Sequence, residues 1–310
     1  MARTLLNNFD FMALRKPAMV LSVVLLLASV VSLGTLKLNL GIDFTGGSII
    51  EVGYPQAVEL EPIRDALEAG GFADAIVQHF GSASEVLIRL VPDADKEKAE
   101  LSSEVIGLLN QASDTEIDVR RVDFVGPQVG EELTEDGGLA VLYALIAILI
   151  YVAFRFEYRF SLGAVAALVH DVLITLGIFS ILQLDFDLSV LAAILAVIGY
   201  SLNDTIVVFD RVRENFRKIR KKTSLEIVNS SINQTISRTL MTSFTTLLVL
   251  LSLFFLGGEV IHAFALALII GVLVGTYSSI YVATTTALAL GISRSDLLLP
   301  EKEGEEMARP

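Results

Sequence analysis

The chain has 310 residues, 53% of them hydrophobic, a mean hydropathy of +0.65 and a formal net charge of −13, which together indicate a protein that crosses a bilayer. The acidic balance argues against nucleic acid as a partner, since phosphate binding needs a basic face. There is no cysteine, the three histidines are far apart, and no glycine-rich nucleotide motif is present, so we expect no cofactor, no metal and no enzymatic reaction.

Uncharged apolar runs long enough to cross ~30 Å of hydrocarbon predict six transmembrane helices. They lie at 17–36, 138–154, 161–182, 188–209, 239–256 and 263–290. The first run follows Arg15 and Lys16 and therefore resembles a signal peptide. Its apolar core is long and no clean A-x-A exit follows it, so we interpret it as a retained signal anchor.

In the short segments that flank and connect the predicted spans, lysine and arginine fall on one side of the membrane. They precede the first span, flank the turn between the second and third spans, and cluster at 211–222, whereas 183–187 and 257–262 contain neither. The positive-inside rule therefore predicts that both termini are cytoplasmic. The basic run sets this topology and could also contact lipid head groups. The predicted organisation is a cytoplasmic tail at 1–16, the first span at 17–36, a periplasmic domain at 37–137, five spans within 138–290 and a cytoplasmic tail at 291–310.

The external segment 37–137 carries seven Lys or Arg and 21 Asp or Glu residues. Its alternating and helical periodicities predict the order β-α-β-β-α-β. The elements are expected at 48–54, 59–70, 73–80, 84–91, 95–112 and 116–125. This order matches the split ferredoxin-like α+β motif, which buries a core without disulfides.

Two glycine-containing stretches, Gly41–Ser48 and Phe124–Pro127, frame this domain. Turn formation explains both, because paired glycines permit turn geometry and Gly-Pro ends a strand. They are also candidates for hinge or contact positions. The residues concerned are Asp43, Gly46, Gly47, Gly126 and Pro127.

Four ionisable residues lie well inside the predicted spans: His170, Asp171, Asp204 and Arg238. Charge inside a bilayer indicates a functional site, because its insertion is costly unless it meets a partner or water. Asp204 lies roughly 24 Å and Arg238 roughly 27 Å from the outer ends of their spans, at 1.5 Å per residue. The two share a depth and each stands on a polar helix face, so they form a candidate proton site.

Polar neighbours extend this site: Ser201, Asn203 and Thr205 beside Asp204, and Thr242 one turn after Arg238. Sodium is an alternative ion, because a carboxylate with nearby hydroxyls could ligate it. An inert ion pair between Asp204 and Arg238 is the structural alternative.

Two further groups inside the spans have a structural and a functional explanation. Hydrogen bonding between helices explains His170 and Asp171 as well as a relay role does. In the sixth span, small residues on one face predict a close-packing seam against another helix. They include Gly271, Gly275 and Ser278.

Several stretches resemble the SecF family. They are Gly41–Gly47, Phe124–Pro127, Ile198–Val208, Asp210–Asn215, Thr235–Leu240 and Ser278–Tyr281. The resemblance runs from the first span to about residue 291. It implies half of a membrane domain of the resistance–nodulation–division superfamily of proton-coupled transporters, located in the bacterial inner membrane.

The resemblance also implies partners and a mechanism. SecD would supply six more spans, and YajC, the SecYEG channel and the translocating preprotein would be further partners. Proton flow would promote export of the preprotein after its ATP-driven insertion into the channel. Asp204 and Arg238 match the proton-pathway aspartate and arginine of the family.

Two other functions fit the composition. A stand-alone proton-coupled exporter of lipids or small molecules, working as a homodimer, would need a roomy apolar pocket outside the membrane. A structural scaffold of the translocation channel would use Asp204 and Arg238 only to hold helices together.

Overall fold

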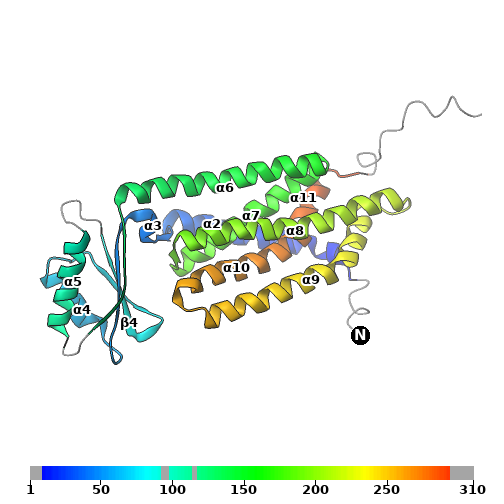
Figure 1. Cartoon of the computed structure of the whole chain (residues 1–310). Coiled ribbons are helices and arrows are strands. Elements are labelled where there is room, and N and C mark those ends of the chain that lie inside the picture. Colours follow the sequence, from blue (N-terminus) through cyan, green and yellow to red (C-terminus); the bar gives the residue numbers. More distant parts are fainter. Residues whose placement is uncertain (1–8, 92–97, 114–116, 294–310) are drawn as a thin grey trace, which may run out of the picture.

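The computed structural model describes residues 9–91, 98–113 and 117–293, which form a bundle of long helices with a smaller α+β domain at one end (Figure 1). Six helices in this part of the chain are long and apolar enough to cross a membrane, which confirms the predicted fold class. The first is α2 (Arg15–Thr35), preceded by the 3-10 turn η1 (Phe11–Leu14). The others are α6 (Pro127–Arg155), α7 (Tyr158–Leu182), α8 (Leu188–Lys218), α9 (Ser224–Leu256) and α10 (Glu259–Ser278), which continues through the π-helical segment η2 (Ser279–Ala283) into α11 (Thr284–Ala289).

These helices extend beyond the apolar runs from which the spans were predicted. Helix α6 begins at Pro127 instead of near 138, α8 continues to Lys218, and α9 begins at Ser224 instead of near 239. Hydropathy detects only the apolar middle of a helix, whereas polar turns continue the same helix towards water. The α+β fold accordingly ends at Val125, and residues 127–137, which were assigned to the external domain, form the first turns of α6.

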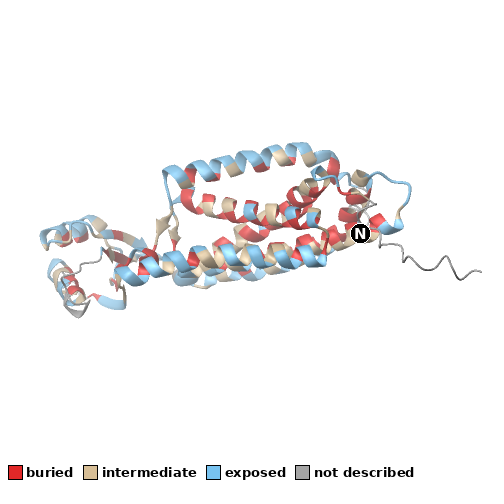
Figure 2. Ribbon diagram, turned by 90° about the horizontal axis from the view of Figure 1, so that it is seen from above, coloured by how far each residue is buried: buried red, intermediate tan, exposed pale blue. Residues whose placement is uncertain are grey.

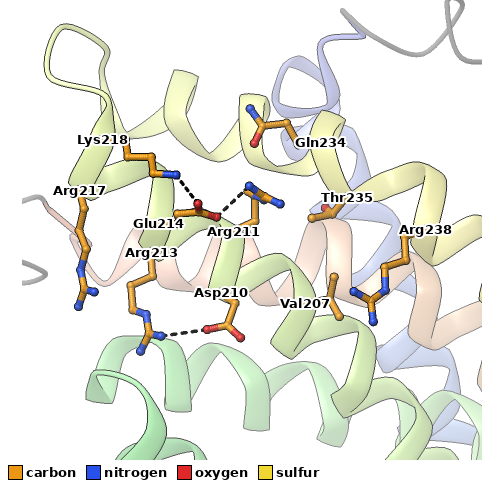
Figure 3. A pocket seen from close by; sticks show the side chains of 10 residues that line it. All are labelled: Val207, Asp210, Arg211, Arg213, Glu214, Arg217, Lys218, Gln234, Thr235 and Arg238. Carbon is orange, nitrogen blue, oxygen red and sulfur yellow. Dashed lines mark hydrogen bonds and ion pairs between the residues drawn. The ribbon is translucent and has the colours of Figure 1, made fainter.

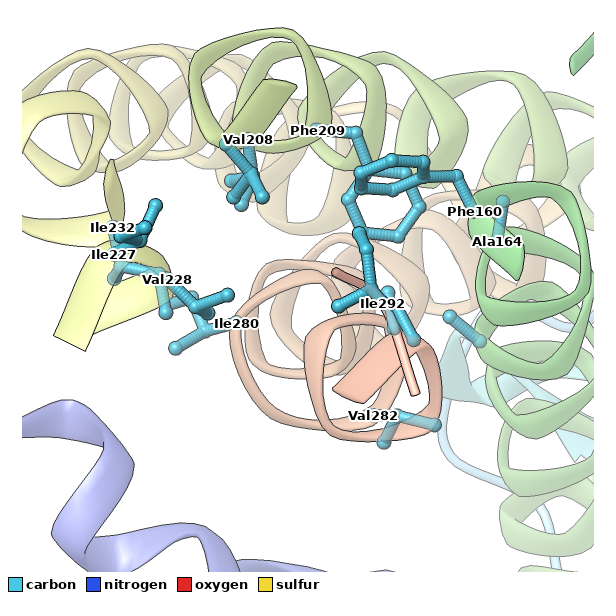
Figure 4. Close-up of a cluster of buried hydrophobic side chains, with 14 of the residues drawn as sticks. Phe160, Ala164, Val208, Phe209, Ile227, Val228, Ile232, Ile280, Val282 and Ile292 are labelled. Carbon is cyan, nitrogen blue, oxygen red and sulfur yellow. The ribbon is translucent and has the colours of Figure 1, made fainter. Parts of the chain in front are cut away.

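Helices α7 and α8 form the centre of the bundle. In the most apolar 18-residue stretch of each helix, 56% of the residues are buried in α7 and 44% in α8, compared with 11% in α6 and 17% in α9. Figure 2 shows where the buried residues lie. At the end that carries the basic connections, Phe160 of α7 and Phe209 of α8 pack edge to face with ring centroids 4.7 Å apart (Figure 4). Such a pair contributes about 1 kcal/mol beyond its buried area. It fixes the two central helices against each other.

The small domain has the predicted order β-α-β-β-α-β. Its elements are β2 (Gly47–Gly53), α4 (Leu60–Ala69), β3 (Ile76–Phe80), β4 (Ser82–Leu90), α5 (Lys98–Ala112) and β5 (Asp118–Val125). The strands pair antiparallel in the order β3-β4-β2-β5, as the ferredoxin-like motif requires. Helices α4 and α5 lie on one face of the sheet, and the other face is turned towards the helix bundle (Figure 1).

The junction between domain and bundle contains two elements that the sequence analysis missed. Strand β1 (Asn39–Leu40) pairs in parallel with β6 (Asp185–Phe186), which lies between α7 and α8. The short helix α3 (Ile42–Thr45) follows β1. Strand propensity over two residues is too weak a signal to predict such a pair.

Candidate functional site

The Asp204 carboxyl is buried midway along α8, where 2% of the residue is exposed. Its Oδ2 atom is buried and accepts no hydrogen bond from the residues that the structure describes. Ser243 of α9 lies beside the carboxyl, and the Ser243 hydroxyl is 2.7 Å from the hydroxyl of Thr276 on α10. A buried acceptor without a donor is costly, and a bound proton or ion would remove that cost.

Arg238 lies close enough to act electrostatically on Asp204, but its side chain is exposed on the outside of the bundle. Its guanidinium has no ion pair or hydrogen bond within the described part of the chain. The buried ion pair considered as the structural alternative is therefore not formed. The hydroxyl of Thr242, the predicted neighbour, donates to the Arg238 and Thr239 carbonyls of its own helix and not to the Asp204 carboxyl.

The Arg238 side chain borders a cavity of about 600 Å³ between α8 and α9 (Figure 3). The lining side chains include five cations and two carboxylates: Arg211, Arg213, Arg217, Lys218 and Arg238, with Asp210 and Glu214. Glu214 pairs with Arg211 at 2.8 Å and with Lys218 at 2.5 Å. The cavity thus joins the basic end of α8 to the surroundings of Arg238.

The other residues predicted around Asp204 separate into buried and exposed ones. Thr205 is buried, and its hydroxyl lies 3.1 Å from that of Ser279 in η2. Ser201 is also buried, but its hydroxyl donates to Asp171 and not to Asp204. Asn203 is exposed and points away from the buried carboxyl. Helical geometry explains this, because residues 203 and 204 are about 100° apart around the axis.

His170 and Asp171 form the centre of a fully buried hydrogen-bond network. His170 Nδ1 is 2.9 Å from Asp171 Oδ1, and the two residues are 2% and 1% exposed. Asp171 Oδ2 accepts from Ser201 at 2.5 Å and from Ser278 at 2.7 Å. On its other side the imidazole Nε2 is 3.2 Å from the hydroxyl of Ser22. One pair of side chains therefore links α2, α7, α8 and α10.

The small residues of the sixth span lie against α8. A Cβ atom at Gly271 would come within 2.0 Å of the Val197 side chain, and one at Gly275 within 3.0 Å of Ser201. Ser278, one turn further, donates to Asp171. Directly after it the helix widens into the π-helical segment η2, a feature frequent at functional sites.

The candidate hinge residues lie at the junction of domain and bundle. The Asp43 carboxylate accepts from the backbone N–H of Leu188 at 3.0 Å and so ties α3 to the start of α8. Gly46 and Gly47 have φ angles of 70° and 121°, which residues with a Cβ rarely adopt. Gly126 is the N-cap of α6 and Pro127 its first residue, a position that suits proline.

Beneath the open face of the sheet lies a cavity of about 680 Å³. It is bordered by the strands, by the connection between α7 and α8, and by the start of α10. Charged side chains such as Glu51, Arg121 and Asp123 line it together with apolar ones, so its lining is mixed and not the apolar one that an exporter of lipids would need.

Sequence reasoning missed Ser22, Ser243 and Tyr277, which complete the buried polar contacts. Isolated hydroxyl residues are common in membrane helices as packing residues, so no signal in the chain distinguished these. In the described part of the chain no three His, Asp or Glu side chains come together as a metal site would require.

Comparison with known proteins identifies the family. Residues 105–293 match the family described as "Protein export membrane protein SecD/SecF, C-terminal", and residues 31–58 match the "SecD/SecF GG Motif". The protein translocase subunit SecF of Vibrio alginolyticus is 55% identical over 97% of this chain and 96% of its own length. The chain belongs to the SecF family. The SecF subunit of Escherichia coli O157:H7 is 46% identical over 97% of this chain and 94% of its own length.

This SecF-family chain also resembles solved structures of SecDF. It superposes on a translocon-associated SecDF from Thermus with a TM-score of 0.83 and 40% identity over 92% of this chain. A SecDF in a "super-membrane-facing form" gives a TM-score of 0.67 at 41% identity over 91%. The chain spans only 39% and 38% of those two SecDF chains. Membership of the SecF family makes it a multi-pass membrane subunit of protein export, a transporter component and not a classical enzyme.

Proposed function

We propose that this chain pairs with a SecD partner in the bacterial inner membrane and uses the proton motive force to promote export of preproteins. The preprotein would already have been inserted into the SecYEG channel by the ATP-driven motor, and YajC would be a further partner. Both termini would be cytoplasmic and residues 37–137 periplasmic. The observation that carries the proposal is the buried Asp204 carboxyl, with an unfilled acceptor, beside an unpaired Arg238 in a SecF-family chain.

The exposure of Arg238 supports a SecD partner at this face. An unpaired guanidinium facing lipid is costly, so a second chain or water must cover it. The solved SecDF chains are more than twice as long as the part that this chain matches, which leaves room for a second half of the membrane domain. The cavity between α8 and α9 would then connect Arg238 to the cytoplasmic side.

The movement of one proton down the membrane potential releases enough energy to drive a conformational change. A full crossing releases about 2.3 kcal/mol per 100 mV of membrane potential. Proton uptake by Asp204 would neutralise the carboxylate and remove its electrostatic attraction for Arg238. The attraction between α8 and α9 would therefore become weaker. The junction residues Asp43, Gly46 and Gly47 would carry that change to the periplasmic domain.

The test is export of a secreted reporter in cells whose only copy carries Asp204→Asn, with membrane abundance measured. Asp210→Asn is the matched control, since it makes the same substitution on the same helix in a carboxylate that already pairs with Arg155 and Arg213. We expect Asp204→Asn to abolish the stimulation of export by the membrane potential at normal abundance, and Asp210→Asn to retain it. Unchanged export with Asp204→Asn would overturn the proposal in favour of a structural scaffold.

A further inference from the structure

The buried network around His170 and Asp171 contains more contacts than its own hydrogens can fill. Four contacts run in one line: Asp171 Oδ1 to His170 Nδ1 at 2.9 Å, His170 Nε2 to Ser22 at 3.2 Å, Ser22 to Tyr277 at 3.0 Å, and Tyr277 to the Ala18 carbonyl at 2.6 Å. Each contact needs one hydrogen. Ser22, Tyr277 and a neutral imidazole supply one each, so one hydrogen is lacking.

The direction of each bond follows from the end of the line. The Ala18 carbonyl only accepts, so the Tyr277 hydroxyl donates to it, and Ser22 must then donate to Tyr277. His170 Nε2 must therefore donate to Ser22. The remaining contact, between Nδ1 and Asp171 Oδ1, is filled only by an added proton on either the imidazole or the carboxyl. In this geometry the pair holds that proton and has zero net charge.

We propose that His170 and Asp171 together form a proton-binding site, separate from Asp204, which takes up one proton and releases it towards Asp204. This rests on the proposed proton-driven function. Ser201, which donates to Asp171, precedes Asp204 by three residues, or about 4.5 Å along α8. Since α8 runs from the end that carries the α+β domain, the pair lies on the external side of Asp204. An incoming proton reaches it first.

Proton release has a defined structural consequence. When the proton moves to Asp204, the net charge of the His170–Asp171 pair changes from zero to −1 and the charge of Asp204 changes from −1 to zero. The total charge inside the bundle is therefore conserved. Without the added proton the Ser22 hydroxyl turns to donate to Nε2. The oxygens of Ser22 and Tyr277 then face each other with no hydrogen between them. The hydrogen bond between Ser22 and Tyr277 is lost while the one from Tyr277 to the Ala18 carbonyl remains, so proton release weakens the link between α2 and α10.

The surroundings of the pair contain few other titratable groups. Within the described helices packed against it, Tyr277 is in contact with the network, with its ring stacked on the imidazole at 6.1 Å. Asp204 lies on α8, Tyr281 lies in η2, and the cations Arg15 and Lys16 stand at the start of α2. No ion pair joins any of these to the pair within the described residues, so the added proton is what balances the Asp171 charge.

The test is the protonation state of His170 measured by ¹⁵N NMR. The full chain, labelled with ¹⁵N-histidine in this chain only, is assembled with its SecD partner in bacterial phospholipid membranes. His79→Gln and His262→Gln leave His170 as its only histidine. We expect Nε2 to carry a proton at neutral pH. A neutral imidazole protonated at Nδ1 alone would overturn the proposal. An Nε2 proton that is still present at alkaline pH would also overturn it, because a neutral imidazole protonated at Nε2 beside an ionised Asp171 holds no added proton.

Two serine variants distinguish a proton site from simple packing. Ser22→Ala removes the acceptor of Nε2, so we expect the Nε2 proton to be lost at neutral pH. Ser32→Ala removes another buried contact between α2 and α7, with Ser180 at 2.7 Å, and should leave the His170 spectrum unchanged. Equal spectra for both variants would contradict the proposal. The ¹⁵N spectra do not depend on export. Spectra that contradict the His170–Asp171 site would therefore leave the Asp204 proposal standing, and a negative result in the Asp204 export test would not alter the expected spectra.

Discussion

The Arg89 guanidinium on β4 and the Asp185 carboxylate on β6 lie 3.2 Å apart, so one ion pair joins the α+β domain to the connection between the central helices α7 and α8. Asn39 donates to the same carboxylate oxygen at 2.7 Å, and Gln78 donates to the other at 3.3 Å. The Arg89 side chain is 13% exposed. Water screens such a partly buried pair only weakly, so it holds the orientation of the domain.

Loss of this pair should loosen the domain. We expect Arg89→Gln to broaden the distance distribution between spin labels on α4 and on the connection between α9 and α10, because a charge-assisted contact of about 1.5–3 kcal/mol is lost. Arg64→Gln is the control, since Arg64 pairs with Glu61 and donates to the Val77 carbonyl on β3, so both of these contacts lie inside the α+β domain. Equal distributions in the two variants would show that Arg89 does not position the domain.

Gly130 is expected to be required where α6 passes α3. A Cβ atom at Gly130 would come within 2.8 Å of the Gly46 backbone nitrogen and 2.9 Å of the Phe44 carbonyl oxygen, and neither backbone atom can move aside easily. We expect Gly130→Ala to lower the free energy of unfolding by about 1–3 kcal/mol. Gly138→Ala on the same helix meets nothing within 4 Å and should be neutral. Thermal unfolding in detergent measures both, and similar melting temperatures would contradict the close approach.

The contact between α8 and α10 gives a second glycine prediction. Gly271→Ala places a methyl group into Val197, so we expect about 1–3 kcal/mol of destabilisation and weaker packing of α10. Gly199→Ala, on α8 with open space around it, should not destabilise the protein. The readout is thermal unfolding with membrane abundance. A Gly271→Ala protein as stable as the Gly199→Ala protein would mean that the two helices separate without cost.

Two substitutions of Arg238 should distinguish the effect of its positive charge from the effect of its side-chain shape. We expect Arg238→Gln to lose export driven by the membrane potential, because no cation then balances Asp204, while Arg238→Lys retains part of it. Lys222→Gln, in the basic connection between α8 and α9, changes the net charge equally and should export normally. Reporter export with and without a protonophore measures this. Full stimulation in Arg238→Gln would remove Arg238 from the proposed pathway.

Local patterns determined most of the architecture. The strand at 48–54 is observed at Gly47–Gly53 and the helix at 59–70 at Leu60–Ala69, because short elements with one buried face reveal their period directly. Helix ends were less accurate, as α9 shows, because its first turns are polar and begin with a capping box at Thr223 and Glu226. That motif marks a helix start independently of hydropathy.

By itself the sequence determined that ionisable residues stand inside the spans and that Asp204 and Arg238 share a depth. Only the tertiary structure decided their partners. It leaves Arg238 unpaired on the outside, buries Asp204 beside Ser243, and gives His170 and Asp171 contacts on three other helices. The physical reason is that depth depends on position along one helix, whereas partnership depends on how helices rotate and cross. Packing across the whole bundle sets those rotations, and no local pattern records them.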